Sequence, residues 1–165
     1  AQGFKILLTL SLTLALLSKA EAANREYYVR AEEVIHDYGP LGVDAMSGLA
    51  FDGHADADVF MVNRPQSHQI GRQYWKCLYI EYTDGTFTER KPRPQWMGFL
   101  GPTLRAEVGD RLSVMFQNNC TNPLTMHPHG LKYTKAFEGA VYADGHDGRG
   151  DYVTPGGIYT YLWVA

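Results

Sequence analysis

The sequence has no cluster of basic residues, and its formal net charge is −3, so its charge gives no basis for binding nucleic acid. Only one long apolar run occurs, near the amino terminus, and no other segment is apolar enough to cross a bilayer. Beyond that run no stretch sustains helical periodicity, and no internal repeat is visible. With 165 residues, the chain is long enough for one domain with a hydrophobic core and too short for two comfortable ones.

The amino-terminal apolar run predicts a secretory leader. Lys5 precedes the run 6–17, and the small residues Ala20 and Ala22 occupy the two positions that a signal peptidase reads. A membrane anchor would need about 20 apolar residues, so the shorter run favours a signal peptide over residues 1–22. The domain then covers residues 23–165. Because a strand-like run continues almost to the final residue, we expect this domain to be a truncated part of a longer protein.

Short strands joined by turns are predicted for the rest of the chain. In residues 111–118, Leu112, Val114 and Phe116 lie on one face and polar residues on the other, as in a half-buried strand. The stretch 39–58, rich in glycine and aspartate, predicts a long loop. Together with secretion and turns rich in glycine and proline, the pattern predicts an all-β Greek-key sandwich. The other expected strands cover residues 27–35, 74–82, 103–108 and 159–164.

The two cysteines, Cys77 and Cys120, lie in or beside predicted strands, and secretion permits disulfides. We therefore expect a bridge between neighbouring strands; two separate buried thiols, or a partner elsewhere in a longer chain, are the alternatives. Asn119-Cys120-Thr121 also fits an N-glycosylation sequon, which makes Asn119 a candidate acceptor. A bridged Cys120 would crowd that acceptor.

The segment with the most chemical information is Met126-His127-Pro128-His129-Gly130. If it is extended, residues two apart point to the same side, so both imidazoles can converge on one site. Pro128 stiffens the backbone between them, and Gly130 allows a sharp turn or a close approach. Neutral imidazole suits copper, zinc, iron and nickel, so the pair predicts two metal ligands. The alternative is a pair of ordinary polar side chains on an exposed edge.

Two histidines do not complete a stable transition-metal site, which usually needs three or four protein ligands. The remaining histidines are scattered among predicted loops, where a solvated side chain is the favoured interpretation of each. They are His36, His54, His68 and His146.

Ordered blocks through most of the predicted domain resemble the amino-terminal plastocyanin-like (cupredoxin) domain of multicopper oxidases of the ceruloplasmin and hephaestin type. So many blocks in one order are more specific than the histidine pair alone. The blocks are Arg25-Glu26-Tyr27-Tyr28-Val29, Ala31-Glu32-Glu33-Val34, Asp37-Tyr38, Ile70-Gly71-Arg72, Leu78-Tyr79-Ile80-Glu81-Tyr82-Thr83-Asp84, Gly98-Phe99-Leu100-Gly101-Pro102, Arg105-Ala106-Glu107-Val108-Gly109-Asp110, His127-Pro128-His129-Gly130, Glu138-Gly139-Ala140 and Pro155-Gly156-Gly157.

The resemblance implies a role for each histidine of the pair. In this family the first His-x-His of the first domain contributes to a trinuclear copper cluster shared with the last domain. Carried over, His127 would ligate the type 2 copper and His129 one of the type 3 pair. The cluster reduces dioxygen to water, and a separate blue copper site receives electrons from a reducing substrate, commonly ferrous iron. The other cupredoxin domains of the same chain are therefore the implied partners.

The remaining copper ligands are not found in this sequence. The family's second His-x-His would follow the last residue, and neither Cys77 nor Cys120 has the downstream histidine and methionine order of a blue copper site. We therefore expect this chain alone to be inactive. The resemblance also implies a calcium site, formed by a carbonyl at Lys135 and acidic side chains of which only Asp151 aligns clearly. A surface loop rich in aspartate and glycine is the alternative.

Two other functions compete with the oxidase. The first is a catalytically silent relative like the A domains of coagulation factors five and eight, which the intact His127-Pro128-His129-Gly130 disfavours. The second is a free-standing copper carrier, which the missing set of Cys, His and Met ligands opposes. The expected location is extracellular, either secreted or on the outer face of a membrane-anchored parent. The resemblance implies ferrous iron as the reducing substrate. Phenols and biogenic amines are the alternatives, since the determinants of substrate choice lie near the blue copper, outside these residues.

Overall fold

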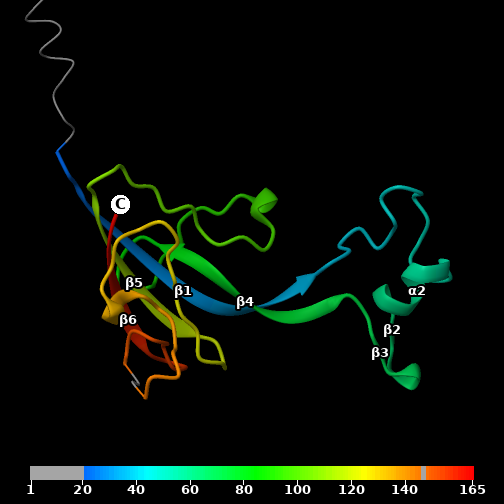
Figure 1. Cartoon of the computed structure of the whole chain (residues 1–165). Helices are drawn as coiled ribbons and strands as arrows, with labels where there is room; N and C mark the ends of the chain where they lie inside the picture. Colours follow the sequence, from blue (N-terminus) through cyan, green and yellow to red (C-terminus); the bar gives the residue numbers. More distant parts are fainter. Residues whose placement is uncertain (1–20, 146–147) are drawn as a thin grey trace, which may run out of the picture.

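The computed structural model describes residues 21–145 and 148–165, so most of the predicted leader and His146 lie outside the described residues. A four-stranded mixed sheet forms the body of the domain, with strand order β4-β1-β5-β6. β1 runs parallel to β5, whereas β4 and β6 run antiparallel to their neighbours (Figure 1). The strands are β1 (Asn24–Asp37), β4 (Gln73–Tyr82), β5 (Arg111–Asn119) and β6 (Ile158–Val164).

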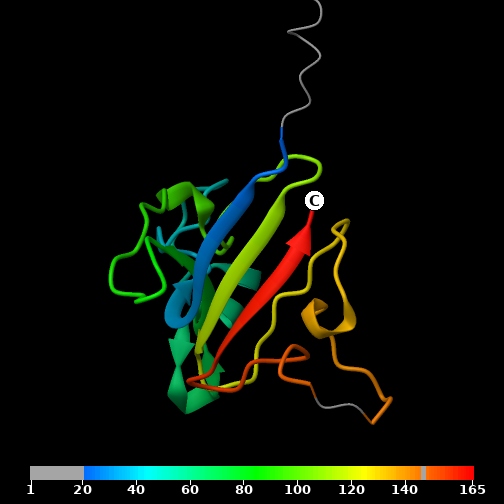
Figure 2. The same ribbon diagram turned by 90° about the vertical axis from the view of Figure 1, so that its left-hand side faces the viewer.

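One face of this sheet carries the main core. Side chains alternate along each strand, which buries Val29 of β1, Val114 and Phe116 of β5 and Tyr161 of β6 completely. The segment that follows β5 runs beside the sheet (yellow to orange in Figure 2) and packs Leu124, Met126, Val153 and other apolar side chains against this core. The predicted all-β, cupredoxin-like class is confirmed, and the same segment carries the histidine pair.

β1 and β4 continue beyond the other two strands as an arm (Figure 1). The arm carries α2 (Ala55–Met61) and a small sheet of β2 (Asn63–Arg64) and β3 (Gln69–Ile70). The expected loop over 39–58 is therefore partly wrong, because α2 begins inside it; seven residues are too few to show a helical period. In the described part of the chain no helix is long and apolar enough to cross a membrane. The 3-10 turns are η1 (Pro65–Ser67), η2 (Gln95–Met97) and η3 (Lys135–Phe137).

The predicted strand over residues 103–108 is also wrong, since this segment runs without strand pairing. A side chain bonds the backbone groups that a neighbouring strand would otherwise pair with. The Tyr27 hydroxyl donates to the Arg105 carbonyl at 2.6 Å and accepts from the Arg105 amide at 3.0 Å. Val108 is 96% exposed, so the apolar residue that suggested a strand contributes almost nothing to a core.

Asp110 joins the start of β1 to the turn before β5. Its carboxylate accepts from the Ala23 amide at 2.7 Å and the Glu107 amide at 2.8 Å, and it also pairs with the Arg25 guanidinium. These two amides, followed by Arg25, lower the pKa of Asp110 to about 2. A carboxylate whose pKa is lowered on folding stabilises the fold above its unfolded pKa, and that stability is lost as the pH falls through the folded pKa.

We therefore expect the Asp110→Asn variant to unfold at a lower temperature than the wild type near pH 6. The wild type should lose stability between about pH 4 and pH 2, and the variant should show a smaller loss over that window. Thermal unfolding followed by circular dichroism at each pH measures both effects. Asp56→Asn, an exposed change in the first turn of α2, is the matched control. A wild-type pH profile in Asp110→Asn would contradict the role of this carboxylate.

Candidate metal centre

The histidine pair lies on an extended segment that follows the isolated β-bridge between Leu124 and Val153. His127 and His129 are exposed, whereas Pro128 between them is buried, so the two rings share one outward-facing side. Their ring centroids are 5.1 Å apart and their planes are at 83°. The structure therefore presents the two imidazoles side by side toward solvent.

A backbone carbonyl orients the His127 ring. Nδ1 of His127 lies 2.7 Å from the Glu138 carbonyl oxygen. A carbonyl can only accept, so Nδ1 carries the proton and the lone pair is left on Nε2. A backbone carbonyl on the second ring nitrogen is a common way to fix the tautomer and the orientation of a metal-binding histidine. His127 is thus set to offer Nε2 to a metal ion.

The half-buried Tyr79 and the buried Tyr161 hold the backbone just before the pair. The Tyr79 hydroxyl donates to the Thr125 carbonyl at 2.7 Å, and burial raises the pKa of Tyr79 to about 12, which keeps this donor protonated. The Tyr161 hydroxyl lies 3.1 Å from Thr125 Oγ1, which itself donates to the Gly139 carbonyl at 2.9 Å. These bonds tie the segment before His127 both to the sheet and to the loop that contains Glu138.

Close backbone packing at Gly139 allows the Glu138 carbonyl to reach His127. Gly139 has a φ of +70°, and a Cβ there would lie 2.1 Å from the Met126 carbonyl oxygen. Only glycine fits at position 139, because any side chain would disfavour this φ and clash with the Met126 carbonyl. No sequence pattern predicted roles for Tyr79, Thr125 or Glu138. The Glu138-Gly139-Ala140 block was the one available signal, because a glycine there can indicate a close approach between backbones.

In the candidate calcium site, the Asp151 carboxylate already binds a cation of the protein, the side-chain ammonium group of Lys135. Lys135 Nζ donates to Asp151 Oδ1 at 2.9 Å and to the Ala140 carbonyl at 2.7 Å. Asp151 is 2% exposed, and its other oxygen accepts from the Gly148 amide at 2.8 Å. A calcium ion on the Asp151 carboxylate would have to displace this ammonium group, because two cations repel strongly at such a distance. The observed contacts therefore do not fit a calcium site at these two residues.

The two cysteines meet at one end of the sheet. Cys77 of β4 and Cys120, just after β5, have Cα atoms 6.2 Å apart and are paired as a disulfide. The expectation that the bridge joins neighbouring strands is wrong, because β1 lies between β4 and β5. Asn119 is exposed beside this bridge. The hydroxyl of Thr121 in the candidate sequon donates to Glu33 Oε1 at 2.6 Å, and this bond contributes to a lowered pKa of Glu33.

The other described histidines lie away from the pair. The His36 ring packs on Tyr38 and Phe99, and His54 Nε2 lies 3.7 Å from an oxygen of Asp44. His68 has a left-handed backbone at the end of η1. Over residues 21–145 and 148–165, no group of three or more His, Cys, Asp or Glu side chains is arranged to hold a metal ion. Within these residues the candidate centre is thus a pair of ligands.

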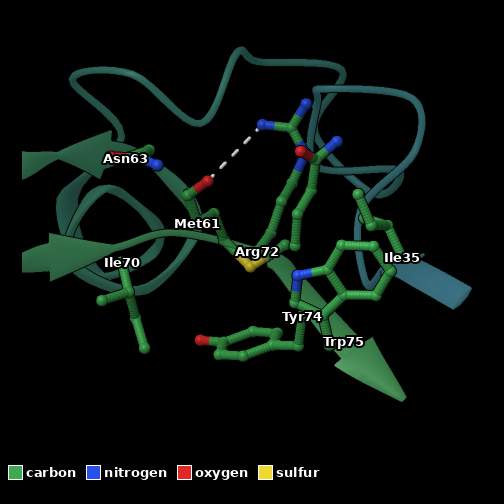
Figure 3. Close-up of a pocket in the computed structure, with 8 residues that line it drawn as sticks. Ile35, Met61, Asn63, Ile70, Arg72, Tyr74 and Trp75 are labelled. Atoms are coloured by element: carbon green, nitrogen blue, oxygen red, sulfur yellow. Dashed lines mark hydrogen bonds between the residues drawn. The ribbon is translucent and has the colours of Figure 1, made fainter. Parts of the chain in front are cut away.

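A separate pocket lies at the base of the arm and does not include the histidine pair (Figure 3). Arg72 crosses it, with Nη1 3.5 Å from the Met61 carbonyl oxygen and Nε bonded to Asp37. Ile35 of β1 and Trp75 of β4 form part of its wall, and both are largely exposed. Its polar groups are thus used to join the arm to the sheet.

The cupredoxin-like sheet presents two imidazoles side by side, and a backbone carbonyl orients the ring of His127. Residues 80–165 match the family described as Multicopper oxidase. The chain belongs to this family, which confirms the resemblance drawn from the sequence blocks.

Curated relatives support the same family over nearly the whole chain. Ferroxidase HEPHL1 of Mus musculus is 42% identical over 153 residues, which cover 91% of this chain and 13% of that protein. Hephaestin of Mus musculus is 38% identical over 146 residues, with 87% of this chain and 12% of that protein covered. Ceruloplasmin of Rattus norvegicus is 40% identical over 161 residues, with 96% and 15% covered. The chain thus spans about one-eighth to one-seventh of the length of these relatives.

Proposed function

We propose that residues 23–165 are the amino-terminal cupredoxin domain of a longer, extracellular multicopper oxidase that oxidises ferrous iron. His127 would bind the type 2 copper and His129 one of the type 3 coppers of a cluster completed by other domains. The observation that carries the proposal is the exposed imidazole pair, in which the Glu138 carbonyl leaves Nε2 of His127 available. The similarity to a relative named as a ferroxidase supports iron as the reducing substrate.

Copper bound at this pair supplies one-electron redox chemistry, through which four electrons convert dioxygen and four protons into two waters. The protein's own contribution is to position and orient the ligands. Pro128 is buried between the two histidines, and Thr125 is hydrogen-bonded to Tyr79 and Tyr161, so the ligand pair is held before any metal arrives. Because both rings face outward, residues from another domain can complete the cluster.

The blue copper site and the other cluster ligands are proposed to lie in further domains of the same chain. Both cysteines of this chain are paired with each other, so neither thiolate would be free for copper. We do not propose calcium at Lys135 and Asp151, since the Lys135 ammonium group already occupies the Asp151 carboxylate.

Oxygen consumption by the purified full-length protein tests this function. Copper-loaded protein supplied with ferrous iron should consume one dioxygen for every four ferrous ions oxidised, without accumulating hydrogen peroxide. An oxygen electrode and a ferric-iron assay on the same sample give this ratio. A copper-loaded, folded protein that consumes no oxygen would instead favour a silent domain like those of coagulation factors five and eight.

We also propose that the leader 1–22 is removed during secretion. The Ala23 nitrogen lies 2.7 Å from Asp110 Oδ1, so cleavage after Ala22 would place a charged amino group against a buried carboxylate. Mass spectrometry of protein secreted by cultured cells should therefore find Ala23 as the first residue. A mature chain that begins elsewhere would contradict this cleavage site. The same spectra would show whether the exposed Asn119, which precedes the bridged Cys120, carries a glycan.

A further inference from the structure

Five consecutive backbone carbonyls, at residues 136–140, each accept a hydrogen bond from a side chain. His127 Nδ1 is one of the five donors, bonded to the third carbonyl of the row. Such a row is unusual, because most hydrogen bonds in folded proteins join backbone carbonyls to backbone amides; here the row starts in the short 3-10 turn η3 and continues beyond it. The donors are, in order along the row, Tyr159, Trp163, His127, Thr125 and Lys135, at distances of 2.7–2.9 Å.

Three of these donors come from a rigid framework. Tyr159 and Trp163 are on β6, and Thr125 is hydrogen-bonded to Tyr79 and Tyr161. They fix the first, second and fourth carbonyls of the row relative to the sheet. The fifth carbonyl, of Ala140, is bonded by Lys135, which is the one charged donor of the five.

The Lys135 ammonium group contacts several groups of the loop at once. Besides Ala140, it contacts the buried Asp151 carboxylate at 2.9 Å, lies 3.7 Å from Glu138 Oε2 and sits 4.2 Å above the centre of the Tyr142 ring. Partial desolvation lowers the pKa of Lys135, but the hydrogen bond and charge of Asp151 outweigh it and raise the pKa, so the group stays charged. One cation thus joins both ends of this loop.

Glu138 connects the Lys135 contacts to the metal ligand. Its carbonyl accepts from His127, while its carboxylate accepts from the Tyr142 hydroxyl at 2.5 Å and faces Lys135. Loss of the ammonium group would remove the positive charge that lies 2.9 Å from an oxygen of Asp151 and 3.7 Å from an oxygen of Glu138. Electrostatic repulsion would then shift the Glu138 backbone, and with it the acceptor that orients His127.

We propose that Lys135 is a positioning residue for the copper ligand His127, and that its ammonium group takes the place at Asp151 that a bound divalent cation would otherwise fill. This inference rests on the proposed role of His127 as a copper ligand. Partners that orient a metal-binding histidine typically change metal affinity or activity by about 10- to 100-fold when they are lost.

The test compares Lys135→Met with Lys135→Arg in the full-length, copper-loaded protein. Electron paramagnetic resonance of the type 2 copper and copper content per molecule are the readouts. In Lys135→Met we expect altered hyperfine splitting or at least about 10-fold weaker copper retention during dialysis, with the blue absorption unchanged. Arginine keeps the charge and should restore most of the wild-type signal. Lys132→Met, an exposed lysine whose backbone pairs with Val164, is the matched control and should behave as wild type.

A wild-type spectrum and wild-type copper retention in Lys135→Met would overturn the inference. If this variant does not accumulate as folded protein, Lys135→Gln removes the same charge while keeping a polar side chain, and it carries the same expectations. His127→Ala in the same series distinguishes failure of the proposed function from failure of the positioning role of Lys135. A normal type 2 signal in His127→Ala refutes the proposed function, whereas loss in His127→Ala with none in Lys135→Met refutes only the positioning role.

Discussion

Replacing His127 or His129 by alanine in the full-length protein should lower the rate of dioxygen reduction by more than about 100-fold, since even partners that merely orient a metal ligand are worth about 10- to 100-fold. The two residues should not be equivalent. Loss of His127 should remove the type 2 signal in electron paramagnetic resonance, whereas loss of His129 should disturb the coupled type 3 pair. In both variants the blue absorption should persist, because we place the blue copper in another domain.

The matched control for this experiment is His68→Asn, at an exposed histidine on the arm. Asparagine is chosen because His68 has a φ of +58°, a left-handed conformation that asparagine tolerates better than alanine. Turnover, the copper signals and the blue absorption should all stay at wild-type values in the control. Oxygen uptake at the wild-type rate in His127→Ala or His129→Ala would contradict the ligand assignment.

The second large effect is expected from the bridge between Cys77 and Cys120. The two residues are 43 positions apart, and closing a loop of that length restricts the unfolded chain by about 4 kcal/mol in the chain-entropy estimate. We expect Cys77→Ala combined with Cys120→Ala to lower the local stability of β4 and β5 by roughly that amount. The double variant is preferable to a single one, which would leave a reactive thiol beside the exposed Asn119.

Amide hydrogen exchange in the full-length protein, followed by mass spectrometry, measures this local stability. Peptides from β4 and β5 should exchange faster in the double variant, by up to about three orders of magnitude at 4 kcal/mol where exchange follows the opening equilibrium. Peptides from other domains serve as the internal control. Unchanged exchange in both strands would mean that the bridge is absent or contributes little to stability.

The strands of the main sheet could be predicted from sequence because their apolar residues alternate and one face is buried. Leu112, Val114 and Phe116 are examples, with exposures of 4%, 0% and 0%. The same reasoning gave a wrong strand over residues 103–108. There the Tyr27 hydroxyl is hydrogen-bonded to the backbone of Arg105, and this contact between residues 78 positions apart cannot be predicted from local sequence. The helix α2 was missed because a single two-turn element shows no period.

The candidate site also combines features that could be predicted from the sequence with features that could not. The spacing of His127 and His129 indicates convergent rings on any extended segment, so the pair could be identified from the sequence. The acceptor for His127 could not, because it is a backbone carbonyl and its identity does not depend on the side chain of Glu138. The resemblance implied calcium at the Lys135 carbonyl and Asp151. The bond from the Lys135 ammonium group to Asp151 could not be predicted, because no local pattern encodes this side-chain placement.

The central claim is that His127 and His129 are copper ligands, and X-ray diffraction from crystals of the full-length protein, recorded on both sides of the copper absorption edge, tests it most directly. The account predicts anomalous peaks within about 2 Å of a ring nitrogen of each histidine, the usual distance from imidazole to a first-row metal. At His127 the peak should lie beside Nε2, with Nδ1 still bonded to the Glu138 carbonyl. Copper-loaded crystals with no peak beside either ring would contradict the account.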